Sequence, residues 1–363
     1  MEKLQTSTQL TATRVFPLDV LKALSILAVV SFHAIFVHPS AYASVGSALD
    51  ILFAPLKFCV PVFLTISFFL LQRGIDRNFG QSNYFLLKKR LLRLLIPTVF
   101  WFGVALLIRK FIWYRTKEEL LLSLFQGTIY PGSYYLLILL QLIPCFVWLY
   151  PWLNRHRFIT ATLILQCLVF VGVYITLSGA FANWLPQILE NLHRPFFIYW
   201  FGYMALGSLL SKHWYKVIKI SQRIPTIVKV ILLLLASTLL IIESTFLSSL
   251  AEPAIAPYDY MMLSCLFSVF VCFLCFASVT EERLSITGRK IVKLLSTYSL
   301  GIYCINGVSQ TIFHALFVTM FPDATFNLLE ILVMKTLGFI LLLSVSIGIS
   351  LLIDKLGGSA LVR

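Results

Sequence analysis

The chain has 363 residues, of which 59% are hydrophobic and only 12% are charged. Soluble domains carry about 25% charged residues, so this composition excludes an ordinary soluble protein and indicates a polytopic membrane protein. The formal net charge of +14 would suit a nucleic-acid-binding protein. The basic residues gather in short loops between apolar runs, however, so we do not expect nucleic acid as a partner.

Apolar runs of about 20 residues, the length of a membrane-spanning helix, recur along the whole chain. Helices satisfy their own backbone hydrogen bonds in lipid, and the alternating pattern of a membrane barrel is absent. We predict an all-α fold with ten transmembrane helices, in one membrane domain over 1–363 that opens with a polar cytoplasmic segment, 1–16. The predicted spans are 18–37, 50–71, 94–113, 133–152, 159–178, 195–211, 226–248, 260–279, 296–320 and 329–353.

The first span contains an acid, a base and an imidazole: Asp19, Lys22 and His33. Lys22 and His33 are eleven positions apart, so on a helix they share a face to within about 20° and lie roughly 16 Å apart along the axis. A cation at the membrane edge and a titratable ring near the bilayer midplane therefore face the same neighbouring helices.

Basic residues concentrate in alternate loops. They are Arg73, Arg77, Lys88, Lys89, Arg90 and Arg93 after the second span, Arg155 and Arg157 after the fourth, Lys212, Lys216, Lys219, Arg223 and Lys229 after the sixth, and Arg283, Arg289, Lys290 and Lys293 after the eighth. The opposite loops hold few, among them Arg115, Lys117 and Arg194. The positive-inside rule then places both termini in the cytoplasm.

The segment 73–93 ends in FLLKKRLLRLLIP, where basic and apolar residues alternate at helical spacing. It suits an amphipathic helix on the inner surface that runs into the third span. Arg90 and Arg93 are one turn apart on that helix. Two interpretations stay open: a lipid-headgroup anchor, or a phosphate clamp, since guanidinium groups bind phosphate through two hydrogen bonds.

Polar residues inside the other spans are few, and ionisable ones are costly there. Lys57, between two prolines of the second span, is a candidate partner for Asp19 or for a substrate carboxylate. Tyr134 and Tyr135 open the fourth span and suit either an aromatic belt or a substrate site. The seven cysteines lie nearly all in apolar spans and show no metal-site spacing, so we expect no metal or redox centre.

Six segments together resemble a known family. They are LDVLKALSILAVVSFHA, VPVFLTISFFLL, FLLKKRLLRLLIPTVFW, YYLLILLQLIPCFVWLYPWL, FFIYWFGYMALGSLL and STYSLGIYCIN. In this order they resemble the first span, the second span, the basic loop with the third span, the fourth span, a middle span and the start of the ninth span of the acyltransferase-3 family of bacterial membrane acyltransferases. Each motif alone is mostly apolar, but the ordered set is specific and covers most of the chain.

The resemblance implies a ten-helix O-acyltransferase of the bacterial inner membrane. Such an enzyme moves an acyl group from cytosolic acyl-CoA to a carbohydrate hydroxyl facing the other side. Acetyl on a cell-surface or lipid-linked polysaccharide is the commonest implication, and other acyl groups such as succinyl stay open. Three positions depart from the family pattern: Lys22 stands where arginine is commonest, Phe68 where glycine often follows the serine, and Asn306 where many members have histidine.

O-acylation needs a base that takes a proton from a hydroxyl as it attacks a thioester. His33 is the candidate general base, because the ordinary pKa of histidine lies near working pH. Lys22, Arg90 and Arg93 would hold the anionic nucleotide end of the donor, acyl-CoA. Direct transfer is our preferred mechanism, with an acyl-histidine relay as the alternative. The residues expected to bind substrate are Asp19, Lys57, Ser67, Tyr134, Tyr135 and Asn306.

The expected partners are acyl-CoA, a carbohydrate acceptor and membrane lipid; no oligomeric state follows from the sequence. The rival function is a transporter or flippase for a sugar or lipid-linked saccharide. It would explain the spans and the buried charges, but the paired Gly/Pro-interrupted spans typical of alternating access are not seen. A non-catalytic scaffold is a third interpretation, and it leaves the aligned Lys22 and His33 unexplained.

Overall fold

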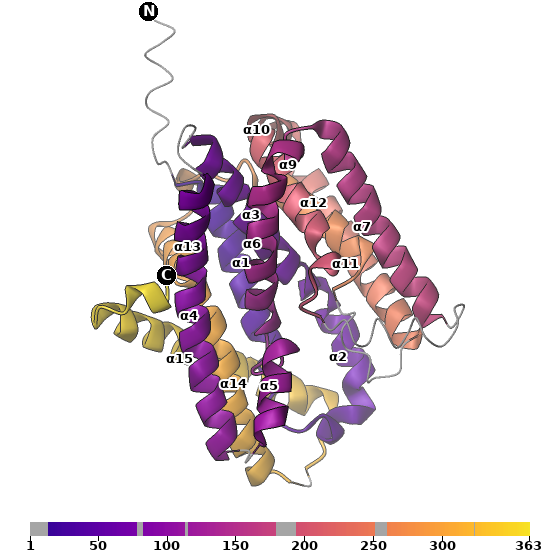
Figure 1. Cartoon of the computed structure of the whole chain (residues 1–363). Coiled ribbons are helices and arrows are strands. Elements are labelled where there is room, and N and C mark those ends of the chain that lie inside the picture. The colour runs from indigo at the N-terminus through magenta and orange to yellow at the C-terminus, as the bar shows by residue number, and fades with distance from the viewer. Residues whose placement is uncertain (1–13, 78–82, 113–114, 179–193, 251–259, 323) are drawn as a thin grey trace, which may run out of the picture.

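The computed structural model describes residues 14–77, 83–112, 115–178, 194–250, 260–322 and 324–363, and every regular element in these ranges is a helix (Figure 1). The all-α prediction is therefore confirmed. The α-helices are α1 (Phe16–Phe32), α2 (Gly46–Phe53), α3 (Cys59–Arg77), α4 (Asn83–Ile112), α5 (Lys117–Phe125), α6 (Tyr134–Leu153), α7 (His156–Leu177), α9 (Phe201–Lys212), α10 (Trp214–Arg223), α11 (Thr226–Leu250), α12 (Leu263–Phe276), α13 (Ile286–Thr297), α14 (Ser299–Met320) and α15 (Leu328–Lys355). Short 3-10 turns are η1 (Pro39–Val45), η2 (Ala54–Phe58), η3 (Phe197–Tyr199), η5 (Glu281–Arg283) and η6 (Ser359–Leu361).

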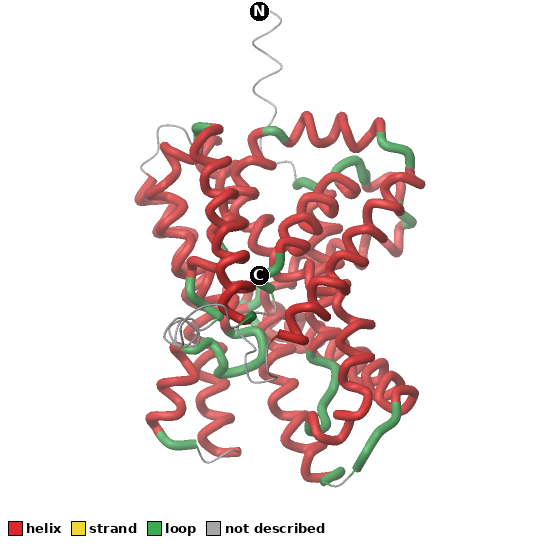
Figure 2. The backbone as a smooth tube through the Cα atoms, turned by 90° about the vertical axis from the view of Figure 1, so that its right-hand side faces the viewer, coloured by secondary structure: helices red, strands yellow, loops and turns green. Residues whose placement is uncertain are grey.

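Helix α1 lies at the centre of the bundle. It packs against α3, α12, α13, α14 and α15, and most of its side chains are buried. A helix that is apolar on nearly all faces is expected to be surrounded by other elements. The tube view shows the surrounding helices as a bundle, with the described chain free of strands (Figure 2). The few polar side chains of α1 therefore face neighbouring helices.

Helices α3 and α9 pack closely because a glycine lies between them. A Cβ on Gly207 of α9 would lie 2.6 Å from the carbonyl oxygen of Thr65 and 2.9 Å from the amide nitrogen of Phe69. Small residues let membrane helices approach at backbone distance. This contact holds α3, which carries Ser67, against the middle of the bundle.

Seven stretches in the described residues are long and apolar enough to cross a membrane: Pro39–Arg77, Leu87–Ile112, Tyr134–Leu153, His156–Leu177, Thr226–Leu250, Ser299–Met320 and Leu328–Lys355. The chain is thus an integral membrane protein by its helices. The helices at the first, sixth and eighth predicted spans, α1, α9 and α12, have only 17, 12 and 14 residues. By length and composition the described residues provide seven membrane-spanning stretches, so the predicted count of ten transmembrane helices stays a prediction.

Two of the predicted spans are broken in the structure. The first, predicted as 18–37, is helical only to Phe32. Its last turn is closed by Lys335 of α15, which donates a hydrogen bond to the carbonyl oxygen of Ser31. The second, predicted as 50–71, consists of the end of α2, the turn η2 and the start of α3, and η2 begins around Pro55. Proline lacks the amide hydrogen that would continue the preceding helix.

One end of the bundle collects the basic loops. The start of α1, helix α10 and the turn between α6 and α7 stand together at the upper end of Figure 1. We call this the basic end. The segment predicted as a surface helix, 73–93, divides between the end of α3 and the first turns of α4, with 78–82 outside the described residues. By the positive-inside rule the basic end is predicted to face the cytoplasm.

The glycine contact between α3 and α9 gives a stability prediction. We expect Gly207→Ala to lower the melting temperature of the purified protein, because the backbone of α3 must move away. Gly172→Ala on α7 is the matched control, since a Cβ there meets nothing within 4 Å. Alanine favours helix over glycine by about 1 kcal/mol, so the control should melt at or above the wild-type temperature. Equal melting of both variants would contradict the close contact.

Candidate functional site

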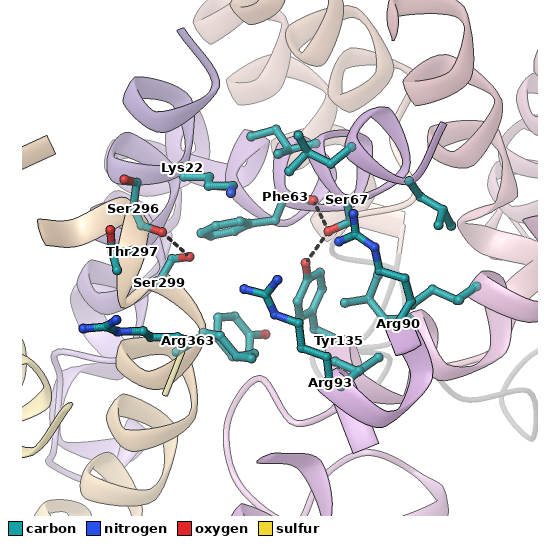
Figure 3. A pocket seen from close by; sticks show the side chains of 18 residues that line it. Lys22, Phe63, Ser67, Arg90, Arg93, Tyr135, Ser296, Thr297, Ser299 and Arg363 are labelled. Carbon is teal, nitrogen blue, oxygen red and sulfur yellow. Dashed lines mark hydrogen bonds between the residues drawn. The ribbon is translucent and has the colours of Figure 1, made fainter. Parts of the chain in front are cut away.

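A cavity of about 250 Å³ opens between α1, α3, α4, α6 and the start of α14. We call it the cationic cavity. Lys22 of α1 and Arg93 of α4 point into it, and Arg90 lies beside Ser67 on its far wall (Figure 3). The lining residues are Lys22, Phe63, Ile66, Ser67, Leu70, Leu71, Arg90, Arg93, Leu94, Tyr135, Leu139, Ile143, Ser296, Thr297, Ser299, Leu300, Tyr303 and Arg363.

The three cations predicted from sequence are brought together here by the regularity of their helices. Lys22 lies in the second turn of α1, and Arg90 and Arg93 lie one turn apart on α4. A Cβ on Gly74 of α3 would lie 3.5 Å from the Nη2 atom of Arg90, so this glycine leaves room for the guanidinium. The three cations expected to bind phosphate thus lie together in one cationic patch at the basic end.

The acid nearest Lys22 along α1, Asp19, acts on it electrostatically but does not line the cavity. Among the described residues that line the cavity none is a carboxylate. Asp19, one turn before Lys22, forms a salt bridge with Arg14. Arg14 also donates to Ser296 Oγ at 2.7 Å and so ties the start of α1 to α13. Arg363 donates to Asp354 and to Tyr298, and its guanidinium points away from Lys22 (Figure 3).

The cavity therefore presents an excess of positive charge in a partly enclosed space. Helix α14 begins at its rim, since Ser299 and Leu300 belong to the lining, and a helix start carries a partial positive charge. Such a site attracts an anion with several negative charges, and guanidinium groups bind phosphate oxygens well.

Aromatic and hydroxyl groups close the inner end of the cavity. Ser67 donates a hydrogen bond to the carbonyl oxygen of Phe63 at 2.9 Å, and its Oγ lies 3.4 Å from the hydroxyl of Tyr135. The rings of Tyr135 and Tyr303 pack with centroids 5.1 Å apart. Tyr303 donates to the carbonyl oxygen of Gly132 at 2.7 Å. Gly132 has a φ of 91°, a conformation that glycine adopts readily, and this turn brings its carbonyl to Tyr303.

His33 is the cap residue that directly follows the last residue of α1, Phe32. Its Nδ1 atom lies 2.6 Å from Nδ2 of Asn306. Asn306 is completely buried, and its Oδ1 has no hydrogen-bond partner in the described part of the chain. Asn306 follows Tyr303 by three residues on α14, so the two share a face one turn apart. The His33–Asn306 pair is thus the next polar feature after Tyr303.

Four residues predicted to bind substrate do not line the cationic cavity: Asp19, Lys57, Tyr134 and Asn306, the last of which pairs with His33 as described above. Asp19 is buried against Arg14, as described above. Lys57 in η2 donates to Ser244 Oγ of α11 at 2.8 Å. The ring of Tyr134 stacks on Trp200 with centroids 6.2 Å apart and lies under the guanidinium of Arg194. Neighbouring residues of a helix point about 100° apart, which is why Tyr135 faces the cavity and Tyr134 does not.

The structure adds residues that the sequence analysis missed. Tyr303 forms the inner wall, although it stands inside the quoted motif STYSLGIYCIN. Lys335 is 5% exposed, and its Nζ lies 4.0 Å from the centroid of the Phe53 ring as well as against Ser31. A charged residue in the middle of the last apolar run was a signal for a buried contact. Ser296 and Thr297 open the same motif as Tyr303, and for Arg363 the local sequence offers no such signal.

The comparisons with known proteins agree with this architecture. The family model described as an acyltransferase domain, that of the acyltransferase-3 family, matches residues 17–355, nearly the whole chain. No curated protein and no solved structure matches the chain. The matched range runs from the second residue of α1 to the end of α15 and includes all the cavity residues except Arg363. The chain therefore belongs to the acyltransferase-3 family, and it is a membrane acyltransferase by that membership.

Proposed function

We propose that the protein transfers an acyl group, acetyl in the simplest case, from cytosolic acyl-CoA to a hydroxyl of a cell-surface or lipid-linked carbohydrate. The observation that carries this proposal is the cationic cavity, whose inner wall lies one helical turn from the His33–Asn306 pair. The cavity supplies a site for a polyanionic donor, and the pair supplies a base. We place the enzyme in a bacterial inner membrane with the basic end in the cytoplasm.

The donor would enter from the basic end. Coenzyme A carries its phosphates at one end and its thioester at the end of a slender arm. Lys22, Arg90 and Arg93 would bind the phosphates, and the arm would extend along α1 toward His33. The axial separation of Lys22 and His33, roughly 16 Å on an α-helix, suits such an extended arm. Tyr135 and Tyr303 lie on this path, so their rings must leave room for the arm when the donor binds.

The chemistry at His33 is general base catalysis. The ring nitrogen takes the proton of the acceptor hydroxyl while the oxygen attacks the thioester carbon. The bond from carbon to sulfur then breaks, and the proton passes from the imidazolium to the departing thiolate. The products are the ester and free coenzyme A, so atoms and charge balance without a covalent acyl-enzyme. A positioned base of this kind contributes about 10²–10⁴-fold in rate.

Asn306 determines which nitrogen of His33 carries the proton. A half-turn of its carboxamide places Oδ1, which lacks a partner in the described chain, opposite an Nδ1–H group. The ring then keeps its lone pair on Nε2, which is the form that accepts a proton. We infer that the reacting enzyme uses this orientation. Asparagine can fill this role in place of the more common histidine because only a fixed acceptor is needed.

The transporter alternative finds no support in the family match, which implies an acyltransferase. The broken second span is explained by Pro55 and by its packing against α11. We therefore propose no second function.

The base assignment predicts the behaviour of one histidine variant. His33→Ala should lower acceptor-dependent release of free thiol from acetyl-CoA by about 10²-fold or more. The exposed His156→Ala at the basic end is the matched control and should keep wild-type turnover. Near-normal turnover in a folded His33→Ala protein would exclude the general-base role.

The donor site predicts a change in binding rather than in chemistry. Arg93→Ala should raise the apparent KM for acetyl-CoA by roughly tenfold or more, because a charge-assisted hydrogen bond contributes about 1.5–3 kcal/mol. Turnover at saturating donor should fall much less. Lys89→Ala removes a neighbouring charge that is exposed and outside the cavity lining, and it should leave KM unchanged. If the two variants changed the KM for acetyl-CoA equally, Arg93 would be assigned to lipid anchoring and not to donor binding.

The positioning role of Asn306 predicts a split between kinetic constants. Asn306→Leu keeps the side-chain size but removes the hydrogen bond to His33. We expect kcat to fall by about tenfold or more while the KM for acetyl-CoA stays within about twofold, because the donor site is separate. A parallel rise in KM, or a kcat equal to wild type, would show that Asn306 does not act through His33.

A further inference from the structure

A second cavity, of about 260 Å³, lies toward the end of the bundle opposite the basic end. It is formed where the last turns of α4 approach the turn before α6 and the second half of α14. Its lining residues are Arg109, Arg115, Pro131, Gln310, Thr311 and His314. None of these residues belongs to the cationic cavity.

The second cavity and the cationic cavity lie on opposite sides of His33–Asn306 along α14. Tyr303 of the cationic cavity precedes Asn306 by three residues, while Gln310 of the second cavity follows it by four. His314 follows one turn later, and its Nδ1 atom bonds the carbonyl oxygen of Phe36 at 2.8 Å. Phe36 is only three residues beyond His33 in the chain. Along α14 the second cavity therefore begins about one turn beyond Asn306, on the side away from the cationic cavity.

The wall between the cavities is backbone. A Cβ on Gly307 would lie 2.5 Å from the ring of Tyr130 and against the carbonyl of Pro131. The turn that carries Pro131 and Gly132 thus packs directly on α14, with Pro131 in the second cavity and Gly132 bonded to Tyr303. This close approach at Gly307 lies between the two sets of lining residues.

The charge of the second cavity is positive. Arg109 is half-buried and donates to the carbonyl oxygen of Thr128 at 2.7 Å. Within the described chain no carboxylate forms a salt bridge with Arg109, and none lines this cavity. Arg115 is different, because it pairs with Glu119 at 3.2 Å and both groups are about half exposed. A partly buried guanidinium that meets only neutral oxygen favours an anionic ligand.

We propose that the second cavity binds the acceptor, and that the acceptor is a saccharide carrying an anionic group close to the hydroxyl that is acylated. The proposal rests on the proposed function and specifies its acceptor. Arg109 binds the anionic group, and the amide of Gln310 offers both a donor and an acceptor to sugar hydroxyls. The anion is either the carboxylate of a uronic acid or a phosphate ester, since a guanidinium binds both through two hydrogen bonds.

The test measures acceptor binding directly, with the full chain in nanodiscs of uncharged lipid. The probes are a galacturonic acid trimer, a galactose trimer bearing one phosphate ester, and the neutral galactose trimer. Titration calorimetry should show at least one anionic trimer binding about tenfold or more tightly than the neutral trimer. Whichever anionic trimer binds more tightly identifies the carboxylate or the phosphate as the recognised group. Equal binding of the neutral trimer, or no binding of either anionic trimer, would overturn the proposal.

Charge variants locate the anion. Arg109→Gln should weaken binding of the anionic trimer by about tenfold or more and leave binding of the neutral trimer unchanged. Lys110→Gln is the matched control, since Lys110 is exposed on the next position of α4 and lies outside the cavity lining; it should bind as wild type. Arg109→Lys keeps the positive charge but cannot form the two parallel hydrogen bonds of a guanidinium. Its affinity for the anionic trimer should lie between those of the wild type and Arg109→Gln. Unchanged binding in Arg109→Gln protein would overturn the assignment.

Acetyl-CoA binding to the same samples separates the two proposals. If the anionic trimer binds through Arg109 and acetyl-CoA does not bind, the anion site stands and the donor assignment fails. If acetyl-CoA binds and the trimers behave alike, the proposed function stands and the anionic acceptor is excluded.

Discussion

The end of α1 is the feature on which the candidate site depends. The apolar run continues to Val37, yet the helix stops at Phe32, and its end is held from two sides. Lys335 of α15 binds the carbonyl of Ser31, and Asn306 of α14 binds the ring of His33. A cation at a helix C-terminus is favourable because the carbonyls there carry partial negative charge. The imidazole thereby lies where the end of α1 meets α14.

Two cavities lined by cations lie toward opposite ends of the bundle from this point. On the basic end, Lys22 and two arginines of α4 face a space lined by no described carboxylate. On the other end, Arg109 faces a second such space. Of the acids near these cations in sequence, Asp19 is paired with Arg14 and Glu119 with Arg115. Cations left unbalanced on both sides of one histidine suit a reaction whose two substrates enter from opposite faces of a membrane.

Much of the fold class and part of the site could be predicted from sequence. The helical fold follows from apolar runs, and the meeting of Lys22 with Arg90 and Arg93 follows from regular helical spacing near one membrane edge. The contact of His33 with Asn306 could not be predicted, because it depends on where α1 ends. That end is capped by Lys335, which is 304 residues away from Ser31 in the chain. Similarly, only tertiary packing decides that Tyr135 rather than Tyr134 faces the cavity.

The most direct test is a structure of the protein in nanodiscs with a thioether analogue of acetyl-CoA that cannot transfer its acyl group. The account predicts the phosphates beside Lys22, Arg90 and Arg93, and the carbonyl carbon of the analogue within about 4 Å of the space next to His33, where an attacking hydroxyl would be in hydrogen-bond reach of the ring. An analogue bound with its phosphates elsewhere, or with its acyl end turned away from the His33–Asn306 pair, would contradict it.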